Sequence, residues 1–144
     1  MSRTTWRVLL LVLLALAGCG AGDKEARSRA AAEGYLQAMK DKNPDRAMTF
    51  FARTFFETRS PAGWKADLRI ITARLGVVQA YSLKNWTWRT DFVPPDSGTH
   101  VTLHYEVKYA KHPATETFVV YKPFVRGEYK IVGHTIASRG LIQE

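Results

Sequence analysis

The spacing of apolar residues changes at Val77, and this change limits the fold more than any other feature of the sequence. Before it, apolar residues recur at helical spacing, most clearly from Trp64 to Leu75. After it, apolar and polar residues alternate, and the segment 100–110 is typical of a strand with one buried face. Helices followed by a series of strands predict an α+β domain, with the N-terminal helices in the concave face of a curled four-stranded antiparallel sheet.

Three helices are predicted before the change. The first spans about 24–41, the second begins at Pro44 after Asn43, and the third runs over 61–75 after Ser60. Asparagine or serine followed by proline is a typical helix start, because proline suits the first helical position. The second helix carries four phenylalanines, Phe50, Phe51, Phe55 and Phe56. They cover so wide an arc that we expect this helix to be largely buried.

Four strands are predicted after the change, over 77–92, 100–110, 114–124 and 128–138. In the first strand the apolar residues change parity between Leu83 and Trp86. One extra residue near Lys84-Asn85 restores a common face, so we expect a β-bulge there. The dipeptide Arg126-Gly127 predicts a tight hairpin between the last two strands.

An apolar run over 8–17 ends beside the only cysteine of the chain. Its ten residues are about half of what a membrane-spanning helix needs, so the run is typical of a signal-peptide core. The alternative is an uncleaved N-terminal anchor. Leu16-Ala17-Gly18-Cys19 resembles a bacterial lipobox, which implies cleavage between Gly18 and Cys19 and acyl chains on the cysteine sulfur.

The lipobox resemblance also implies a location. In a Gram-negative host, Gly20 in place of the aspartate linked to inner-membrane retention implies the periplasmic face of the outer membrane. An extended tether after Cys19 reaches only about 15 Å, so we expect the domain to lie close to the lipid surface. The predicted division is a signal peptide at 1–18, a lipidated cysteine and short tether at 19–25, the α+β domain at 26–139 and a C-terminal tail at 140–144.

The chain is basic, with 21 Lys and Arg against 13 Asp and Glu. Such a balance favours anionic headgroups or acidic partners, although interleaved charges are also what an ordinary solvated surface carries. No run of basic residues is clustered, so we expect no binding to nucleic acid.

Several segments together resemble the nuclear-transport-factor-2-like (cystatin-like) cone fold over about 26–139. They are Trp64, Leu75-Gly76, Glu116-Thr117-Phe118-Val119-Val120 and Glu128-Tyr129-Lys130-Ile131-Val132-Gly133-His134. In that family the position of Tyr129 is often tryptophan. The resemblance implies a cone-shaped domain that commonly dimerises through its sheet, but it does not fix a function, because this fold serves isomerases, dehydratases and binding modules alike.

Two regions are candidates for function. The first is the cone interior, expected to be lined by Phe51, Phe55, Trp64, Leu68, Trp88 and Tyr105. Such a lining suits a lipid-like or aromatic molecule, unless these side chains fill the space themselves as an ordinary core.

The second region is the sheet face that the last two strands present on the other parity. Its expected members are Phe118, Val120, Val132 and Ile136, with Lys108, Lys122 and Lys130 as a basic rim. Apolar residues on both parities indicate that both faces need cover, and a partner protein or a second copy would supply it. The alternative is that the first helix or the segment 140–144 covers this face.

No catalytic or metal-binding motif occurs in the sequence. His100 and His104 lie about 13 Å apart along a strand, too far for one metal ion, so we expect no metal and no cofactor. For an enzyme of this fold, Tyr35, Asp67, Asp91 and Tyr105 are the polar residues to inspect.

We therefore expect a membrane-anchored periplasmic lipoprotein that is not an enzyme and acts as a protein-interaction module, self-dimerisation included. The alternative is a binding protein for a small lipophilic ligand in the cone interior. A hydrolase- or isomerase-like enzyme ranks third.

Overall fold

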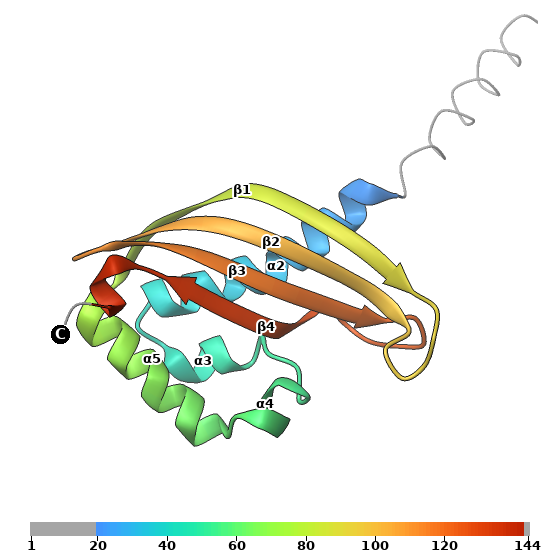
Figure 1. Ribbon diagram of the computed structural model, residues 1–144, viewed down its shortest axis with the longest axis horizontal. Coiled ribbons are helices and arrows are strands. Elements are labelled where there is room, and N and C mark those ends of the chain that lie inside the picture. Colours follow the sequence, from blue (N-terminus) through green and yellow to red (C-terminus); the bar gives the residue numbers. More distant parts are fainter. Residues whose placement is uncertain (1–19, 143–144) are drawn as a thin grey trace, which may run out of the picture.

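The computed structural model describes residues 20–142, and the predicted signal and Cys19 lie outside them. The helices are α2 (Ala21–Lys40), α3 (Pro44–Met48), α4 (Phe55–Thr58), α5 (Pro61–Leu75) and the 3-10 helix η2 (Arg139–Leu141). The strands are β1 (Val78–Asp91), β2 (Gly98–Tyr109), β3 (Pro113–Pro123) and β4 (Lys130–Ala137). The strands form one antiparallel sheet in chain order, which arches over the helices (Figure 1). The predicted α+β class is confirmed.

Helix α2 lies across the concave side of the sheet and contacts all four strands. Alanine-rich sequence favours the helix, and Arg29 bridges Glu25 and Glu33 along its exposed side. Tyr35 and Leu36 are fully buried against the sheet. The helix begins at Ala21, so residues 21–25 of the expected tether are already helical. The folded part therefore starts two residues after Cys19.

The single second helix predicted after Pro44 is wrong. The chain forms the short helices α3 and α4, and the segment between them runs beside β4. Ile131 N donates to the carbonyl of Phe50 at 2.9 Å, and Ala52 N donates to the carbonyl of Ile131 at 2.8 Å. These bonds to a strand 80 residues later replace the helical ones. Of the four phenylalanines only Phe51 is buried.

Helix α5 matches its predicted bounds. The Ser60 hydroxyl accepts a hydrogen bond from Gly63 N at 3.1 Å and caps the start. Gly76 ends the helix with φ 88°, a conformation that favours glycine. A Cβ atom at Gly76 would also lie 2.8 Å from the Ala110 side chain, so glycine is needed for close packing as well.

The β-bulge expected near Lys84-Asn85 is present, because the register with β2 shifts between Leu83 and Asn85. A further shift between β3 and β4 was not predicted. Val119 pairs with Gly133 and Val120 with Ile131, so the parity of β4 changes within its own length. The fully buried Ile131 and the buried side chain of His134 therefore both point to the helices.

The C-terminal segment belongs to the domain rather than to a free tail. Gly140 in η2 is buried, and a Cβ atom there would collide with the His112 ring. Arg74 of α5 donates to the carbonyl of Leu141 at 2.7 Å, which holds η2 against α5. Between residues 20 and 142, no helix combines the length and the apolar character that crossing a membrane requires.

Candidate functional site

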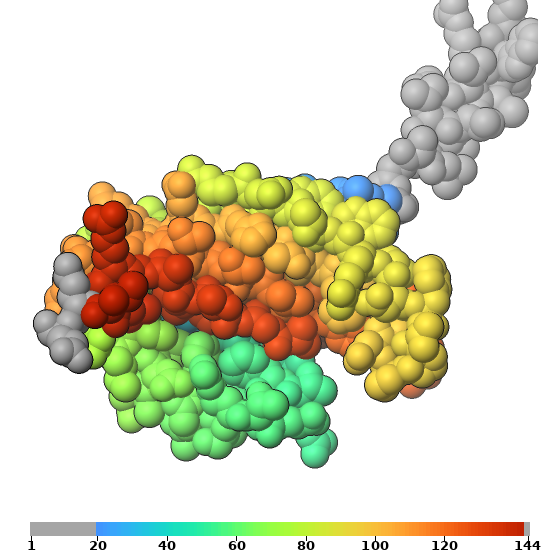
Figure 2. All heavy atoms as spheres, in the orientation of Figure 1, coloured from blue at the N-terminus to red at the C-terminus, as the bar shows by residue number. Residues whose placement is uncertain are grey.

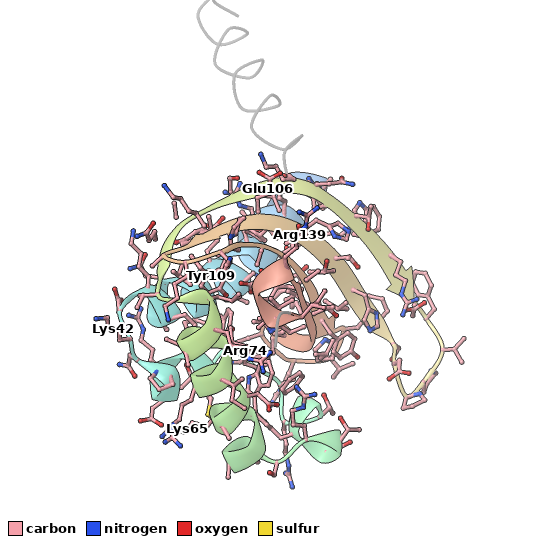
Figure 3. All side chains as sticks on the ribbon, turned by 60° about the vertical axis from the view of Figure 1, so that its left-hand side comes forward. Lys42, Lys65, Arg74, Glu106, Tyr109 and Arg139 are labelled. Atoms are coloured by element: carbon pink, nitrogen blue, oxygen red, sulfur yellow. The ribbon has the colours of Figure 1, made fainter. Side chains whose placement is uncertain are left out.

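A carboxylate lies in the middle of the core. Glu116 of β3 is fully buried, and its Oε1 accepts a hydrogen bond from the Tyr109 hydroxyl. Its Oε2 lies 2.7 Å from Nε2 of His134, whose side chain is also 0% exposed. The strand register brings these residues together across β2, β3 and β4, and Figure 3 labels Tyr109 where the sheet meets α5.

Both oxygens of Glu116 have hydrogen-bond partners, one in Tyr109 and one in His134, as buried polar groups usually do. The tautomer of the His134 ring decides whether its Nδ1 is a donor or an acceptor. Burial, and then the nearby Glu116, raise the pKa of Tyr109, so its hydroxyl keeps its proton.

Aromatic rings enclose His134. Phe118 stacks on it with ring centroids 4.5 Å apart, and Tyr35 lies at 5.0 Å. Trp64 and Phe51 complete the enclosure at 5.6 Å and 6.2 Å. Three of these rings come from helix α2, helix α5 and the segment between α3 and α4. The helices thus form the wall that faces the strand residues.

Three polar atoms in this enclosure have no hydrogen-bond partner among the described residues: the Tyr35 hydroxyl, Nε1 of Trp64 and Nδ1 of His134. All three are buried, and the Tyr35 hydroxyl and the Trp64 indole N–H are donors. Burial, and then Glu116, raise the pKa of Tyr35 well above its usual value, so this hydroxyl also stays protonated. An unpartnered buried donor costs about 1–3 kcal/mol.

Most of the residues predicted to line the interior belong to the hydrophobic core, as the alternative of an ordinary core expected. Phe51, Trp64, Leu68 and Tyr105 are buried, and Phe55 is half-buried. The rings touch: Phe55 lies 4.5 Å from Phe51 and 5.3 Å from Trp64 between centroids. Tyr105 is held from α2, since its hydroxyl donates to Glu33 at 2.9 Å. Burial, and then this bond, raise its pKa.

Trp88 does not belong to the interior, and its prediction as a lining residue was wrong. Its ring is 46% exposed near the end of β1, with the Lys24 ammonium 3.7 Å from its centroid. The bulge puts Trp88 on the concave face as expected, but the strand extends past the enclosure there.

The prediction that Phe118 and Val120 lie at the centre of a partner surface is wrong. Phe118 and Val120 are fully buried, because β3 pairs Phe118 with Leu103 and both point to α2. Helix α2 covers this face, which agrees with the alternative that the first predicted helix covers it. Val132 lies at the β3–β4 register shift, and both it and Ile136 are half-buried.

The three lysines expected to rim that surface do not form a rim. Lys108 is exposed on the convex face, whereas Phe118 points to the concave face. Lys122 lies 5.8 Å from the Tyr129 ring, and Lys130 donates to the carbonyl of Thr49 at 2.9 Å.

Tyr109, Glu116 and His134 were not identified from the sequence as site residues. Of the four residues to inspect for catalysis, only Tyr35 belongs to the cluster. Asp67 pairs with Arg59 at 3.3 Å, and Asp91 pairs with His100 at 3.0 Å. The available signal was a glutamate at an inward position of the run 116–120. This signal can be used only when the strand register is known, because only the register shows which parity faces the helices.

The other histidines point away from this cluster. His104 lies 3.0 Å from the Thr117 hydroxyl on the convex face, and His100 lies beside Asp91 on the same face. In the described part of the chain, no three histidine, cysteine or acidic side chains gather as metal ligands would.

The convex face carries an open depression of about 640 Å³, at the end of the sheet near the β2–β3 turn. Its floor has small side chains and its sides are charged, as in Ala80, Ser82, Glu106, Lys108, Thr115 and Ala137.

Comparisons with protein-family models, with curated proteins and with solved structures found no match to this chain. The class of the protein is therefore defined by its own fold and site. It is a small α+β domain with a curled antiparallel sheet over a helix, and a hydrogen-bonded Tyr–Glu–His cluster in its core.

Proposed function

We propose that this protein is a lipid-anchored cell-envelope protein whose domain binds a small, mostly apolar molecule in the interior of a nuclear-transport-factor-2-like cone. The observation that carries the proposal is the set of three buried polar atoms without a partner, on Tyr35, Trp64 and His134. Native interiors leave few such atoms unpaired, and a bound group is one of the explanations, beside a water or an ion, for those that remain.

The donors define the chemistry of the molecule. The Tyr35 hydroxyl and the Trp64 indole N–H each need an acceptor, and a carbonyl oxygen supplies one. The acceptor is neutral, because a further charge buried in this interior would be costly. The aromatic wall suits a flat or short apolar body. A ketone, an aldehyde, an ester or an amide on an apolar body fits these conditions.

The route to the interior passes α4. This helix has four residues, none of them buried, and its Phe55 and Phe56 cover the outer side of Phe51. Segments with few buried contacts open at low cost. Displacement of α4 exposes the aromatic wall without disturbing the sheet.

Binding is favoured over catalysis by the hydrogen bonds of Glu116. Both carboxylate oxygens are engaged, one by Tyr109 and one by His134. No free carboxylate oxygen is left to take a proton from a substrate, and a general base must reach the proton that it removes.

The lipid anchor is the second part of the proposal. The lipobox resemblance implies acyl chains on Cys19 and a location on the periplasmic face of the outer membrane. The helix that starts at Ala21 supports close apposition to that membrane, because only Gly20 separates it from Cys19 in the sequence. Mass spectrometry of the purified chain tests it: the diacylglyceryl and acyl additions are expected at Cys19 and are lost in Cys19→Ser.

Protein interaction remains a second candidate through a different surface. The convex depression of about 640 Å³ is the observation that favours it, since a second copy or an envelope protein has room there. Ala137→Arg fills the depression with a large charged side chain. A dimer that dissociates in Ala137→Arg supports this candidate, and a monomer at all concentrations excludes self-association.

The ligand proposal is tested by thermal unfolding with two matched probes. Acetophenone carries a carbonyl oxygen on an aromatic body, and ethylbenzene has the same shape without an acceptor. Acetophenone is expected to raise Tm more than ethylbenzene does. The difference disappears in Tyr35→Phe and Trp64→Phe, and it persists in Tyr121→Phe, whose hydroxyl bonds Ser97 away from the site. Equal effects of both probes on the unaltered chain contradict the proposal.

A further inference from the structure

Four large apolar side chains stand in solvent at one end of the sheet. They belong to the β1–β2 and β3–β4 loops and are called the apolar tip here: Phe92 (78% exposed), Val93 (76%), Phe124 (49%) and Val125 (85%). The Phe92 and Phe124 rings touch across the two loops, with centroids 5.5 Å apart. The loops therefore form one continuous apolar surface.

Such a surface is uncommon on a soluble domain. Turns between strands are usually polar, and clustered exposed aromatic residues mark a contact site. Single exposed apolar residues need no explanation, but here two pairs from distant segments meet at one place. Figure 2 shows the yellow β1–β2 loop projecting beyond the rest of the domain at this end.

The apolar tip lies at the end of the molecule where the described chain begins. The Lys24 ammonium, in the first turn of α2, is 3.7 Å from the Trp88 ring, and Trp88 precedes Phe92 by four residues on β1. On the other side of α2, Arg27 and Tyr129 line one surface depression, so the β3–β4 loop also adjoins this helix. In Figure 1 both loops and the first turn of α2 lie at the right-hand end.

Both basic and acidic side chains lie at this end of the molecule. Arg126 sits in the β3–β4 loop directly after the apolar tip, and Lys24 lies over Trp88. Arg89 is exposed and pairs with Asp91 at 3.2 Å. Asp96 of the β1–β2 loop and Glu128 of the β3–β4 loop are exposed acids at this end. What this end shares with interfacial membrane contacts is the cluster of exposed apolar and aromatic residues flanked by cations at Lys24 and Arg126.

We propose that the apolar tip enters the headgroup–acyl boundary of an anionic bilayer, as a second membrane contact beside the lipid anchor. The proposal rests on the proposed lipidation of Cys19, which directly precedes Gly20 at this end. Several acyl chains on Cys19 already give stable attachment. Two contacts also fix orientation: the tip and the start of α2 face the lipid, while α5 and the convex depression stay accessible.

A fluorescent label on the apolar tip tests the proposal. Acylation consumes the thiol of Cys19, so Val125→Cys gives the processed chain one reactive thiol for a nitrobenzoxadiazole label. The matched control is Ile70→Cys, because Ile70 is also an exposed apolar residue but lies on α5. Both chains are bound to vesicles of phosphatidylethanolamine and phosphatidylglycerol, after mass spectrometry has confirmed the acyl chains.

The label at position 125 is expected to shift its emission to shorter wavelength and to lose at least half of its quenching by aqueous iodide. The label at position 70 is expected to keep its emission wavelength and its quenching by iodide. Replacement of Phe92 and Phe124 by serine restores quenching at position 125 in a chain that keeps its circular dichroism spectrum. Equal quenching at positions 125 and 70 on vesicles overturns the proposal. Protection at 125 without vesicles overturns it too, since a second copy then covers the tip.

If the mass spectrum shows no acyl groups, the proposed lipid anchor is disproved, but the proposed membrane contact of the apolar tip is not. In that case the same label is read in a chain that also carries Cys19→Ser, on vesicles to which the chain is added directly. A blue shift at 125 alone supports the tip as a membrane contact by itself, and no shift rejects it.

Discussion

The core around Glu116 and the apolar tip around Phe92 are opposites in composition and in environment. In the core, a carboxylate, an imidazole and two tyrosine hydroxyls are buried among aromatic rings. At the tip, phenylalanine and valine side chains stand in solvent. Each region departs from the usual distribution of polar and apolar residues, and departures of this kind concentrate at functional sites. From this comparison we expect the stability of the domain to depend on the hydrogen-bonded pairing of the polar groups in the core. The apolar tip is expected to add little to stability.

Glu116→Gln tests the dependence of the core on pairing and has the largest expected effect. It replaces the fully buried partner of Tyr109 and His134 by an amide, so we expect a loss of about 3–5 kcal/mol in the free energy of unfolding. The control is Glu106→Gln on the convex face, whose exposed pair with Lys84 at 2.8 Å is worth about 0–1 kcal/mol. Urea unfolding measures both. Similar losses in the two variants would contradict the account.

Alkaline pH tests the buried tyrosines of the core. The folded-state pKa values of Tyr35, Tyr105 and Tyr109 are raised, chiefly by burial. The unfolded chain releases these protons near the usual pKa of about 10, so stability is complete below that pH and falls above it. Each tyrosine contributes a slope of about 1.4 kcal/mol per pH unit. Urea midpoints between neutral and strongly alkaline pH measure the slope, which we expect to be shallower in Tyr105→Phe.

Tyr35→Phe separates an unpartnered donor from a partnered one. Without a ligand, removal of the unpartnered Tyr35 hydroxyl is expected to raise stability by about 1 kcal/mol or leave it unchanged. Tyr109→Phe removes the bond to Glu116 and is expected to lower stability by about 1–3 kcal/mol. Opposite signs in the same urea experiment support the account. A clear loss in Tyr35→Phe indicates that an ordered water already satisfies this hydroxyl.

The apolar tip gives the smallest expected change. Phe92→Ser touches an exposed side chain, so the free energy of unfolding is expected to stay within about 0.5 kcal/mol of the unaltered chain. Phe51→Ala, in the aromatic wall, is expected to cost about 3–5 kcal/mol. A large loss in Phe92→Ser would show that the tip is part of the folding core and would remove the reason to assign it a contact role.

Local signals in the sequence were enough for some elements. The bounds of α5 followed from Ser60 and Gly76, whose roles need no distant partner. The bulge in β1 followed from the parity of Leu83 and Trp86 within one strand. Both predictions depended on neighbours in the chain, which a sequence displays directly.

Pairing between distant segments decided the rest. Phe50–Ala52 left the helical path because Ile131 offers backbone hydrogen bonds. The register shift between β3 and β4 set the facing of His134, and the register with β2 turned Phe118 inward. A change of one residue in register exchanges the two faces of a strand. For this reason the candidate surface was placed on the wrong face and the cluster at Glu116 was missed.

The indole N–H of Trp64 gives the most direct test of the ligand site. Its proton resonance in the nitrogen–proton NMR spectrum is assigned with Trp64→Phe, and acetophenone and ethylbenzene are then added in turn. The account predicts a downfield shift of this resonance with acetophenone and not with ethylbenzene, while the indoles of Trp86 and Trp88 stay in place. An unmoved Trp64 resonance, or the same shift with both probes, would contradict a carbonyl-binding interior.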